Sequence, residues 1–334
     1  MTDYSPDSPA LERELQAVSR TIGRILEEVG KEVIGQDKLK NRLITALITE
    51  GHILLEGVPG LAKTLSIKSL ATCIDATFHR IQFTPDLLPA DLIGTEIFRM
   101  HDSTFEVRRG PVFANFVLAD EINRAPAKVQ SALLETMQER QVTIGEATLK
   151  VPDPFFVMAT QNPIEQEGTY PLPEAQIDRF IMKVKVDYPT REEEKRMLDL
   201  VTSKDASRPH AAKVATLDDI RHAKRIAQSV YVDDRVRQYI VNLVWASRRP
   251  AEFNLNKLRP LIELGASPRA VISLYLASRA EALIAGERYV VPQMIKDVAF
   301  DVLRHRIIPT YEAEAQGLTP DNIIQIILDG VEVP

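Results

Sequence analysis

Short apolar runs alternate along the chain with segments of helical spacing. Five runs have the length and residue types of buried strands, and they cover residues 52–56, 78–83, 116–120, 155–160 and 180–186. Most are separated by segments in which apolar residues recur every three or four positions, as in 63–74 and 125–140. Continuous apolar strands that alternate with helices indicate a parallel sheet covered on both faces, so we predict an α/β domain.

Two pairs of short alternating segments interrupt this series. Residues 95–100 and 104–109 flank a three-residue polar turn and predict a β-hairpin, and residues 140–151 predict a second hairpin that turns near Gly145. Both precede a predicted strand, so the two insertions, about 95–109 and 140–151, would project from the sheet. The pattern leaves open whether they are surface decorations or functional appendages.

Helical spacing dominates both ends of the chain. Apolar residues recur at helical intervals between Leu11 and Val29, and a second helix is expected over 36–49. Beyond residue 187, helices are predicted over 191–203, 217–229, 233–248, 270–285 and 292–305. Thr190 and Glu193 form a predicted capping box for the first of these. We therefore predict a helical extension over 1–30, an α/β domain over 31–188 and an all-α domain over 189–334.

The composition narrows the classes of function. With 334 residues, 45% of them hydrophobic and 26% charged, the chain is an ordinary globular sequence long enough for two domains. A formal net charge of −6 argues against nucleic acid as the main partner. The single cysteine, Cys73, excludes an internal disulfide framework. Neither a signal peptide nor an apolar membrane span is recognisable, so a cytoplasmic location is expected.

Residues 54–64, LLEGVPGLAKT, carry the first candidate chemistry. Gly57, Lys63 and Thr64 match the phosphate-binding pattern G-x-x-x-x-G-K-[ST], but Ala62 occupies the place of the second glycine. The segment follows a predicted strand and opens a predicted helix, so its backbone N–H groups could surround phosphates. Lys63 would bind the β- and γ-phosphates, and the Thr64 hydroxyl would bind Mg²⁺. Alanine keeps the N–H group that contacts phosphate, so the substitution is tolerable.

An acidic pair follows the third apolar strand. Asp120 and Glu121 come at the carboxyl end of residues 116–120, where the Mg²⁺ of a bound nucleotide would lie in a parallel sheet. Asp120 is placed to hold the metal through water, and Glu121 to orient and activate the attacking water. Solvated acids that end a strand are the alternative, and the phosphate-binding pattern upstream favours the metal site.

Three further polar positions are candidates, each with a plain surface or turn role as the alternative. Asn162 ends a predicted strand and could lie between the γ-phosphate and the attacking water. Arg179 precedes the last strand, at the edge of the α/β domain, which suggests that it serves a neighbouring subunit. Arg269 opens a helix of the second domain and could close over the phosphates.

These elements, in this order, resemble those of AAA+ ATPases. The segments similar to the MoxR family in particular are GVPGLAKT (57–64), ADEINRAPAKVQSALLETMQERQVTIG (119–145), ATQNPIEQEGTYPLPEAQIDRF (159–180) and GASPRA (265–270). The resemblance covers roughly residues 30–310 and implies a P-loop NTPase fold, with a five-stranded parallel sheet and a C-terminal all-α lid. Alanine at position 62 looks normal for that family, which points to a functional loop.

The resemblance also implies a role for each candidate residue. Lys63 and Thr64 match Walker A, Asp120 and Glu121 match Walker B, Asn162 matches sensor 1, Arg179 the arginine finger and Arg269 sensor 2. Catalytic roles are thus expected for Glu121, Lys63, Asn162, Arg179 and Arg269, and metal ligation for Thr64 and Asp120. ATP contacts are expected from Val33, Ile34, Gly35, Gly57, Val58, Pro59, Gly60, Leu61, Ala62, Lys63, Thr64, Leu65 and Arg269.

The resemblance implies a ring-forming, usually hexameric, chaperone-like ATPase. Members of such a family often act on partners with von Willebrand factor A domains. The two hairpins match the helix-2 insert and the pre-sensor-1 hairpin, which the family shares with magnesium-chelatase ATPase subunits. The resemblance therefore implies Mg²⁺-dependent ATP hydrolysis at subunit interfaces, coupled to remodelling of a protein partner. Two alternatives stay open: an ATP-gated assembly switch with little hydrolysis, and a nucleic-acid motor that uses Arg99, Arg108 and Arg109 of the first hairpin.

Overall fold

The chain forms two compact units in a computed structural model that describes residues 8–58, 60–101, 103–162, 168–202 and 210–334. The first, here called the sheet unit, contains Arg24–Arg179 and Val184–Ile220. The second, the helical unit, contains the residues up to Gly23 together with Phe180–Lys183 and Arg221–Pro334. The predicted domain boundaries at 30/31 and 188/189 stay predictions.

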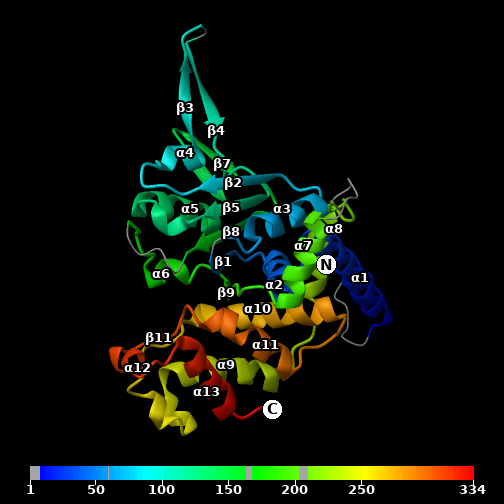
Figure 1. Ribbon diagram of the computed structural model, residues 1–334, viewed down its shortest axis with the longest axis vertical. Helices are drawn as coiled ribbons and strands as arrows, with labels where there is room; N and C mark the ends of the chain where they lie inside the picture. The colour runs from blue at the N-terminus through cyan, green and yellow to red at the C-terminus, as the bar shows by residue number, and fades with distance from the viewer. Residues whose placement is uncertain (1–7, 59, 102, 163–167, 203–209) are drawn as a thin grey trace. The chain divides into compact units, whose positions relative to one another are not determined.

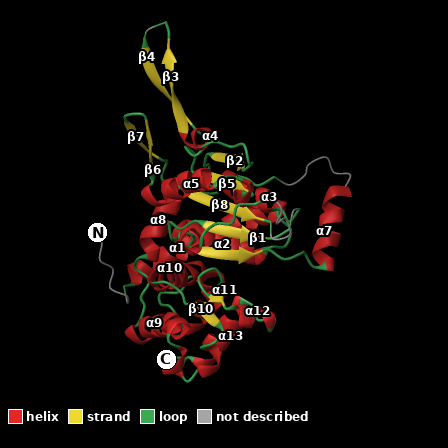
Figure 2. Cartoon of the chain, turned by 90° about the vertical axis from the view of Figure 1, so that its left-hand side faces the viewer, coloured by secondary structure: helices red, strands yellow, loops and turns green. Residues whose placement is uncertain are grey.

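A five-stranded sheet forms the centre of the α/β architecture (Figure 2). Its strands are β1 (Ile53–Glu56), β2 (Phe78–Gln82), β5 (Phe116–Asp120), β8 (Phe156–Gln161) and β9 (Met182–Lys185). They lie in the order β2-β5-β8-β1-β9, and the pairs β2–β5, β5–β8 and β1–β8 are parallel. The predicted fold class is therefore confirmed. The inner strands β5, β8 and β1 are buried along their apolar residues, which explains why their sequences run without alternation.

Helices alternate with these strands along the chain, and the sequence predicts all of them except the short helices at Pro89–Ile93 and Glu174–Ile177 and a 3-10 turn. They are α1 (Pro9–Glu32), α2 (Asp37–Ile48), α3 (Lys63–Cys73), α4 (Pro89–Ile93), α5 (Ala127–Glu139), α6 (Glu174–Ile177), α7 (Arg191–Thr202) and α8 (Leu217–Ala227), with a short 3-10 helix at Ile122–Arg124. The predicted capping box at the start of α7 is confirmed, since the Thr190 backbone N–H donates to Glu193 and the Glu193 N–H donates to the Thr190 hydroxyl. Cys73 is buried, which raises the pKa of its thiol to about 12.

Both predicted hairpins are present. Strands β3 (Gly94–Arg99) and β4 (Thr104–Arg109) are antiparallel and extend away from the sheet (Figure 1). Strands β6 (Gln141–Ile144) and β7 (Ala147–Lys150) form the second hairpin, whose turn contains Gly145 with a φ of +57°. That left-handed backbone suits glycine, and a side chain there would also collide with the Glu96 carboxylate.

The helical unit contains the helices predicted after residue 230 and several elements that the apolar spacing does not predict. The predicted helices are α9 (Asp234–Arg248), α10 (Pro268–Ala285) and α11 (Pro292–Leu303). The additional elements are α12 (Tyr311–Ala315), α13 (Pro320–Gly330), 3-10 turns at Pro250–Phe253 and Asn256–Leu258, and a short antiparallel pair, β10 (Ile262–Leu264) with β11 (Ile308–Pro309). A capping box of Thr319 with Asn322 begins α13. Among the described helices, none has the length and apolar character of a membrane span.

Candidate functional site

The turn between β1 and α3 has the backbone of a phosphate-binding loop. Ala62 is the N-cap of α3 in the left-handed conformation (φ 55°, ψ 19°), and its carbonyl accepts hydrogen bonds from the N–H and hydroxyl of Ser66. Gly60 also has a positive φ, of 86°. A Cβ at Gly57 would lie 2.8 Å from the Val186 carbonyl oxygen, so only glycine fits there. Pro59 lies outside the described residues.

Lys63 begins α3 and points back over the loop, where its ammonium group donates to the Gly57 carbonyl oxygen. Partial burial lowers the pKa of Lys63, and the negative charges of Asp120 and Glu121 act in the opposite direction. An ammonium group held beside the N-terminus of a helix concentrates positive potential at this point. The loop can therefore receive an anion.

A cavity of about 460 Å³ opens in front of this loop. Its lining combines the loop, the carboxyl ends of β2, β5 and β8, and the start of α3, all in the sheet unit. The lining residues are Gly57, Gly60, Leu61, Ala62, Lys63, Thr64, Leu65, Arg80, Gln82, Asp120, Glu121, Thr160, Gln161 and Asn162. The structure thus brings together most of the loop, the acidic pair and Asn162, at the strand ends where parallel sheets bind ligands.

Neighbouring strands hold the Asp120 carboxylate. Its Oδ1 accepts a hydrogen bond of 2.6 Å from the Thr160 hydroxyl on β8, and its Oδ2 accepts 2.6 Å and 3.1 Å bonds from the Arg80 guanidinium on β2. The Glu121 backbone N–H donates to the same Thr160 hydroxyl at 2.8 Å. Thr160 therefore links both acidic residues to the next strand.

The Glu121 side chain has two donors on one oxygen. Gln82 Nε2 lies 2.8 Å from Glu121 Oε2, and Arg124 Nη1 lies 3.0 Å from the same atom. Glu121 has a left-handed backbone (φ 56°), which turns the chain sharply after β5. The carboxylate is consequently oriented by groups before and after it in the chain, at the edge of the cavity.

Sequence reasoning missed Arg80, Gln82, Thr160 and Arg124. The available signal was the alternation in FHRIQF, where the polar residues Arg80 and Gln82 lie two positions apart on a strand and so share one face. Their partners became visible only when the structure placed β2 beside β5, with Gln82 in register with Asp120.

Several predicted contact residues do not line this cavity. Among the described residues, Val33, Ile34, Gly35, Val58 and Arg179 are outside its lining. The Arg179 guanidinium instead donates to the Leu134 carbonyl oxygen at 3.0 Å. Arg269 is an exposed residue in the first turn of α10, in the helical unit. Nucleotide contacts by these residues stay predictions.

The chemistry of the donor set fits a magnesium-bound polyphosphate. Thr64 supplies a hydroxyl and Asp120 a carboxylate to the same cavity, and both are oxygen ligands of the kind that Mg²⁺ prefers. The Lys63 ammonium group and the backbone at the start of α3 suit phosphate oxygens.

Comparisons with known proteins find relatives over nearly the whole chain. Residues 52–182 match the model of the ATPase family associated with various cellular activities (AAA), and residues 258–327 match that of the AAA lid domain. Chaperone MoxR1 of Mycobacterium tuberculosis is 47% identical over 96% of this chain and 84% of its own length. Protein MoxR of Methylorubrum extorquens is 31% identical over 93% of this chain and 94% of its own. The crystal structure of a candidate ATPase from Cytophaga hutchinsonii, 50% identical, has a TM-score of 0.91 and covers 97% of this chain and 98% of that one.

Proposed function

The chain belongs to the MoxR family of AAA ATPases, and from this premise we propose that it hydrolyses ATP with Mg²⁺ at the subunit interfaces of a ring and remodels a protein partner. The observation that carries the proposal is the convergence of the Lys63 loop and the Asp120–Glu121 pair on one cavity. Phosphate binding and water activation need these two groups within reach of a single ligand.

Five residues of the cavity act directly in this reaction. Lys63 and the N-terminus of α3 bind the β- and γ-phosphates, and Thr64 with Asp120 holds Mg²⁺. When bound, Mg²⁺ neutralises negative charge on the phosphate oxygens. The Glu121 carboxylate accepts a proton from the attacking water, and Asn162, which is buried and lines the cavity, orients that water.

Arg179 completes the site of a neighbouring subunit in this proposal. Its guanidinium is only partly exposed and donates to Leu134 in its own chain, away from the lining of its own cavity. An arginine at a subunit edge can enter the next site in a ring, where it stabilises charge that develops on the transferred phosphoryl group. Arg269 contacts the phosphates of its own chain, and a hexamer is the ring that the family resemblance favours.

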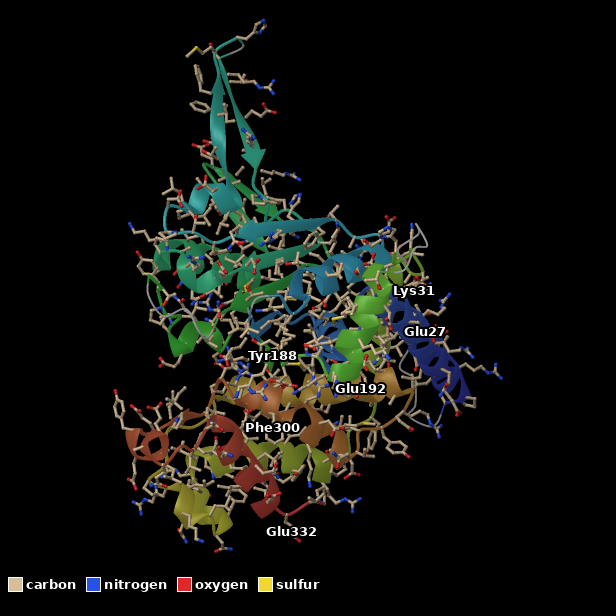
Figure 3. All side chains as sticks on the ribbon, in the orientation of Figure 1. Glu27, Lys31, Tyr188, Glu192, Phe300 and Glu332 are labelled. Atoms are coloured by element: carbon tan, nitrogen blue, oxygen red, sulfur yellow. The ribbon has the colours of Figure 1, made fainter. Side chains whose placement is uncertain are left out.

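The hairpin β3–β4 is the surface that we assign to the partner. The rings of Phe98 and Phe105 pack with their centroids 5.2 Å apart, tilted by 55°, yet the two residues are 48% and 69% exposed. Figure 3 shows the outer end of this hairpin projecting beyond the rest of the sheet unit. Exposed aromatic side chains mark interaction sites. We propose a von Willebrand factor A domain protein as the partner. The cytoplasmic location expected from the sequence stays a prediction.

The decisive experiment mixes two inactive variants. ATPase rate per subunit is measured against protein concentration for wild type, Glu121→Gln, Arg179→Ala and an equimolar mixture of the two. We expect each variant to be inactive and the mixture to recover about a quarter of the wild-type rate, because one interface in four pairs an intact Glu121 with an intact Arg179 in a randomly mixed ring.

Three outcomes would contradict the proposal. A wild-type rate that is flat with concentration, together with an unaffected Arg179→Ala variant, would mean that each chain works alone. Negligible turnover by the wild type, even with its partner present, would instead favour the ATP-gated assembly switch. Stimulation by DNA with a steep salt dependence would point to the nucleic-acid motor.

A further inference from the structure

Three consecutive buried side chains after α11 form hydrogen bonds with the backbone segment that directly follows Arg179. Arg304, His305 and Arg306 are 7%, 6% and 5% exposed, and all three donate to backbone carbonyls of Phe180–Lys183 within the helical unit. We propose that Arg306 is a positioning residue, which links the helix of Arg269 to the backbone that directly follows Arg179 and so positions the arginine finger that the next subunit receives. This inference rests on the proposed function.

Arg306 uses both ends of its guanidinium on the backbone. Its Nη2 donates to the Phe180 carbonyl oxygen at 2.7 Å, and its Nη1 donates to the carbonyl oxygens of Ile181 at 3.1 Å and Val302 at 2.5 Å. Hydrogen bonds from a charged, planar donor are strong and directional, particularly when buried. The backbone one and two residues after Arg179 is therefore fixed to the end of α11.

The same guanidinium reaches the helix that carries Arg269. Arg306 Nη2 also contacts the Ser273 hydroxyl, at 3.3 Å, and Ser273 is a buried residue of α10. Arg269 lies four residues earlier, so the two side chains occupy one face of the helix on successive turns. A displacement of α10 that follows a contact between Arg269 and phosphate would therefore move a direct partner of Arg306.

The sequence neighbours of Arg306, Arg304 and His305, add further hydrogen bonds to the backbone of Phe180–Lys183. His305 Nε2 donates to the Phe180 carbonyl oxygen at 3.1 Å, and burial, followed by the charge of Arg306, lowers the pKa of His305 and keeps it neutral. Arg304 Nη1 donates to the Lys183 carbonyl oxygen at 2.7 Å and pairs with Asp301 and Asp321. A hydrophobic residue in place of Arg306 would be buried in this unit at a lower desolvation cost than the arginine. What the arginine adds is a defined geometry for the carbonyls next to Arg179.

The test asks in which subunit the defect appears. Arg306→Lys keeps the positive charge but cannot donate to several carbonyls from one planar group. We expect turnover to fall between about tenfold and 100-fold, as a displaced catalytic group predicts, with the affinity for a fluorescent ATP analogue within about twofold of wild type. Mixed with Glu121→Gln subunits, which carry an intact Arg179, the variant should recover about a quarter of the wild-type rate.

Two reference mixtures with Glu121→Gln keep the answers separate. Recovery with Arg179→Ala shows that sites are shared, whereas Lys63→Ala must not recover because both defects lie in the chain's own site. If Arg179→Ala recovers and Arg306→Lys does not, Arg306 supports its own site and the inference is overturned while the proposed function stands. If Arg179→Ala fails to recover, both are overturned.

Ser273→Ala is the second variant, for the case in which Arg306→Lys does not fold. It removes one hydroxyl and leaves the bonds of Arg306 to Phe180 and Ile181 in place. We expect a loss of turnover of roughly twofold to tenfold that is also rescued by Glu121→Gln subunits. Wild-type turnover in Ser273→Ala, or a loss that the mixture does not rescue, would overturn the link to α10.

Discussion

The amide of Gln82 donates to the carboxylate of Glu121 across 2.8 Å, from the edge strand β2 to the end of the neighbouring strand β5. The parallel register pairs Gln82 with Asp120, so the residue after Asp120 lies within reach of the amide. Arg124 donates to the same carboxylate oxygen. The group that we propose as the activator of water is thus held in one orientation by a neutral and a charged donor.

Replacing Gln82 with leucine should lower turnover without weakening ATP binding. The Glu121 carboxylate would lose its neutral donor, and an unaligned base costs roughly tenfold in kcat. Steady-state kinetics with a separate measurement of nucleotide affinity check this. Gln238→Leu, the same change at an exposed glutamine on α9, is the control and should match wild type. Equal losses of kcat and affinity in Gln82→Leu would mean that Gln82 contacts the nucleotide instead.

Gly57 and Ala62, two small residues of the loop, should respond differently to exchange. Gly57→Ala places a methyl group 2.8 Å from the Val186 carbonyl oxygen, so we expect ATP affinity to fall at least about tenfold as the loop shifts. Ala62→Gly removes the strain of a left-handed alanine, about 1–2 kcal/mol, but it also raises the conformational entropy of the unfolded chain. The free energy of unfolding should therefore change by less than about 1 kcal/mol. Nucleotide titration measures the ATP affinity of both variants, and urea unfolding measures their stability. Weak binding by Ala62→Gly would show that the alanine methyl group is required.

Asp120→Asn should weaken the binding of Mg²⁺ more than the binding of ATP. Asparagine keeps the shape and a hydrogen bond with Thr160, but it removes the negative charge that attracts the metal and pairs with Arg80. We expect the Mg²⁺ concentration for half-maximal turnover to rise at least about tenfold, whereas metal-free ATP binding stays close to wild type. Chelation of Mg²⁺ should abolish turnover in both proteins. An unchanged Mg²⁺ titration in Asp120→Asn would remove Asp120 from the metal site.

His52 should make the fold sensitive to acid. It is buried, its Nδ1 accepts from the Val157 N–H at 3.0 Å and its Nε2 donates to the Met137 carbonyl at 3.1 Å, so the neutral ring satisfies both neighbours. Burial, helped by the charge of Arg140, lowers the pKa of His52 from 6.5 to about 3. The stabilisation is therefore complete above pH 6.5 and is lost as the pH falls toward 3, by up to about 1.4 kcal/mol per pH unit.

Urea unfolding at pH 7.5 and pH 5 measures this effect. Between these values the wild type should lose about 2 kcal/mol more than His52→Asn, whose side chain does not titrate. His79→Asn is the matched control, because it makes the same chemical change at a histidine that is exposed on β2. If wild type and His52→Asn lose stability in parallel, His52 is not protonated on unfolding in this range.

Local patterns were sufficient for much of this protein. The five strands of the main sheet, most helices, both hairpins and the acidic pair after β5 were predicted because each depends on residues a few positions apart. The same holds for the loop, since a strand, a turn with Lys63 and Thr64, and a following helix are contiguous. Their shared cavity then follows from the general rule that parallel strands end at one edge of a sheet.

Tertiary structure alone decided which distant residues act on those groups. The order β2-β5-β8-β1-β9 differs from the chain order, so neither the reach of Gln82 to Glu121 nor that of Thr160 to Asp120 is visible along the sequence. Arg306 and Phe180 are likewise joined only by folding, across 126 positions. Propensity and spacing act over a few residues, whereas these contacts depend on strand order and helix packing, which bring together segments that the sequence keeps apart.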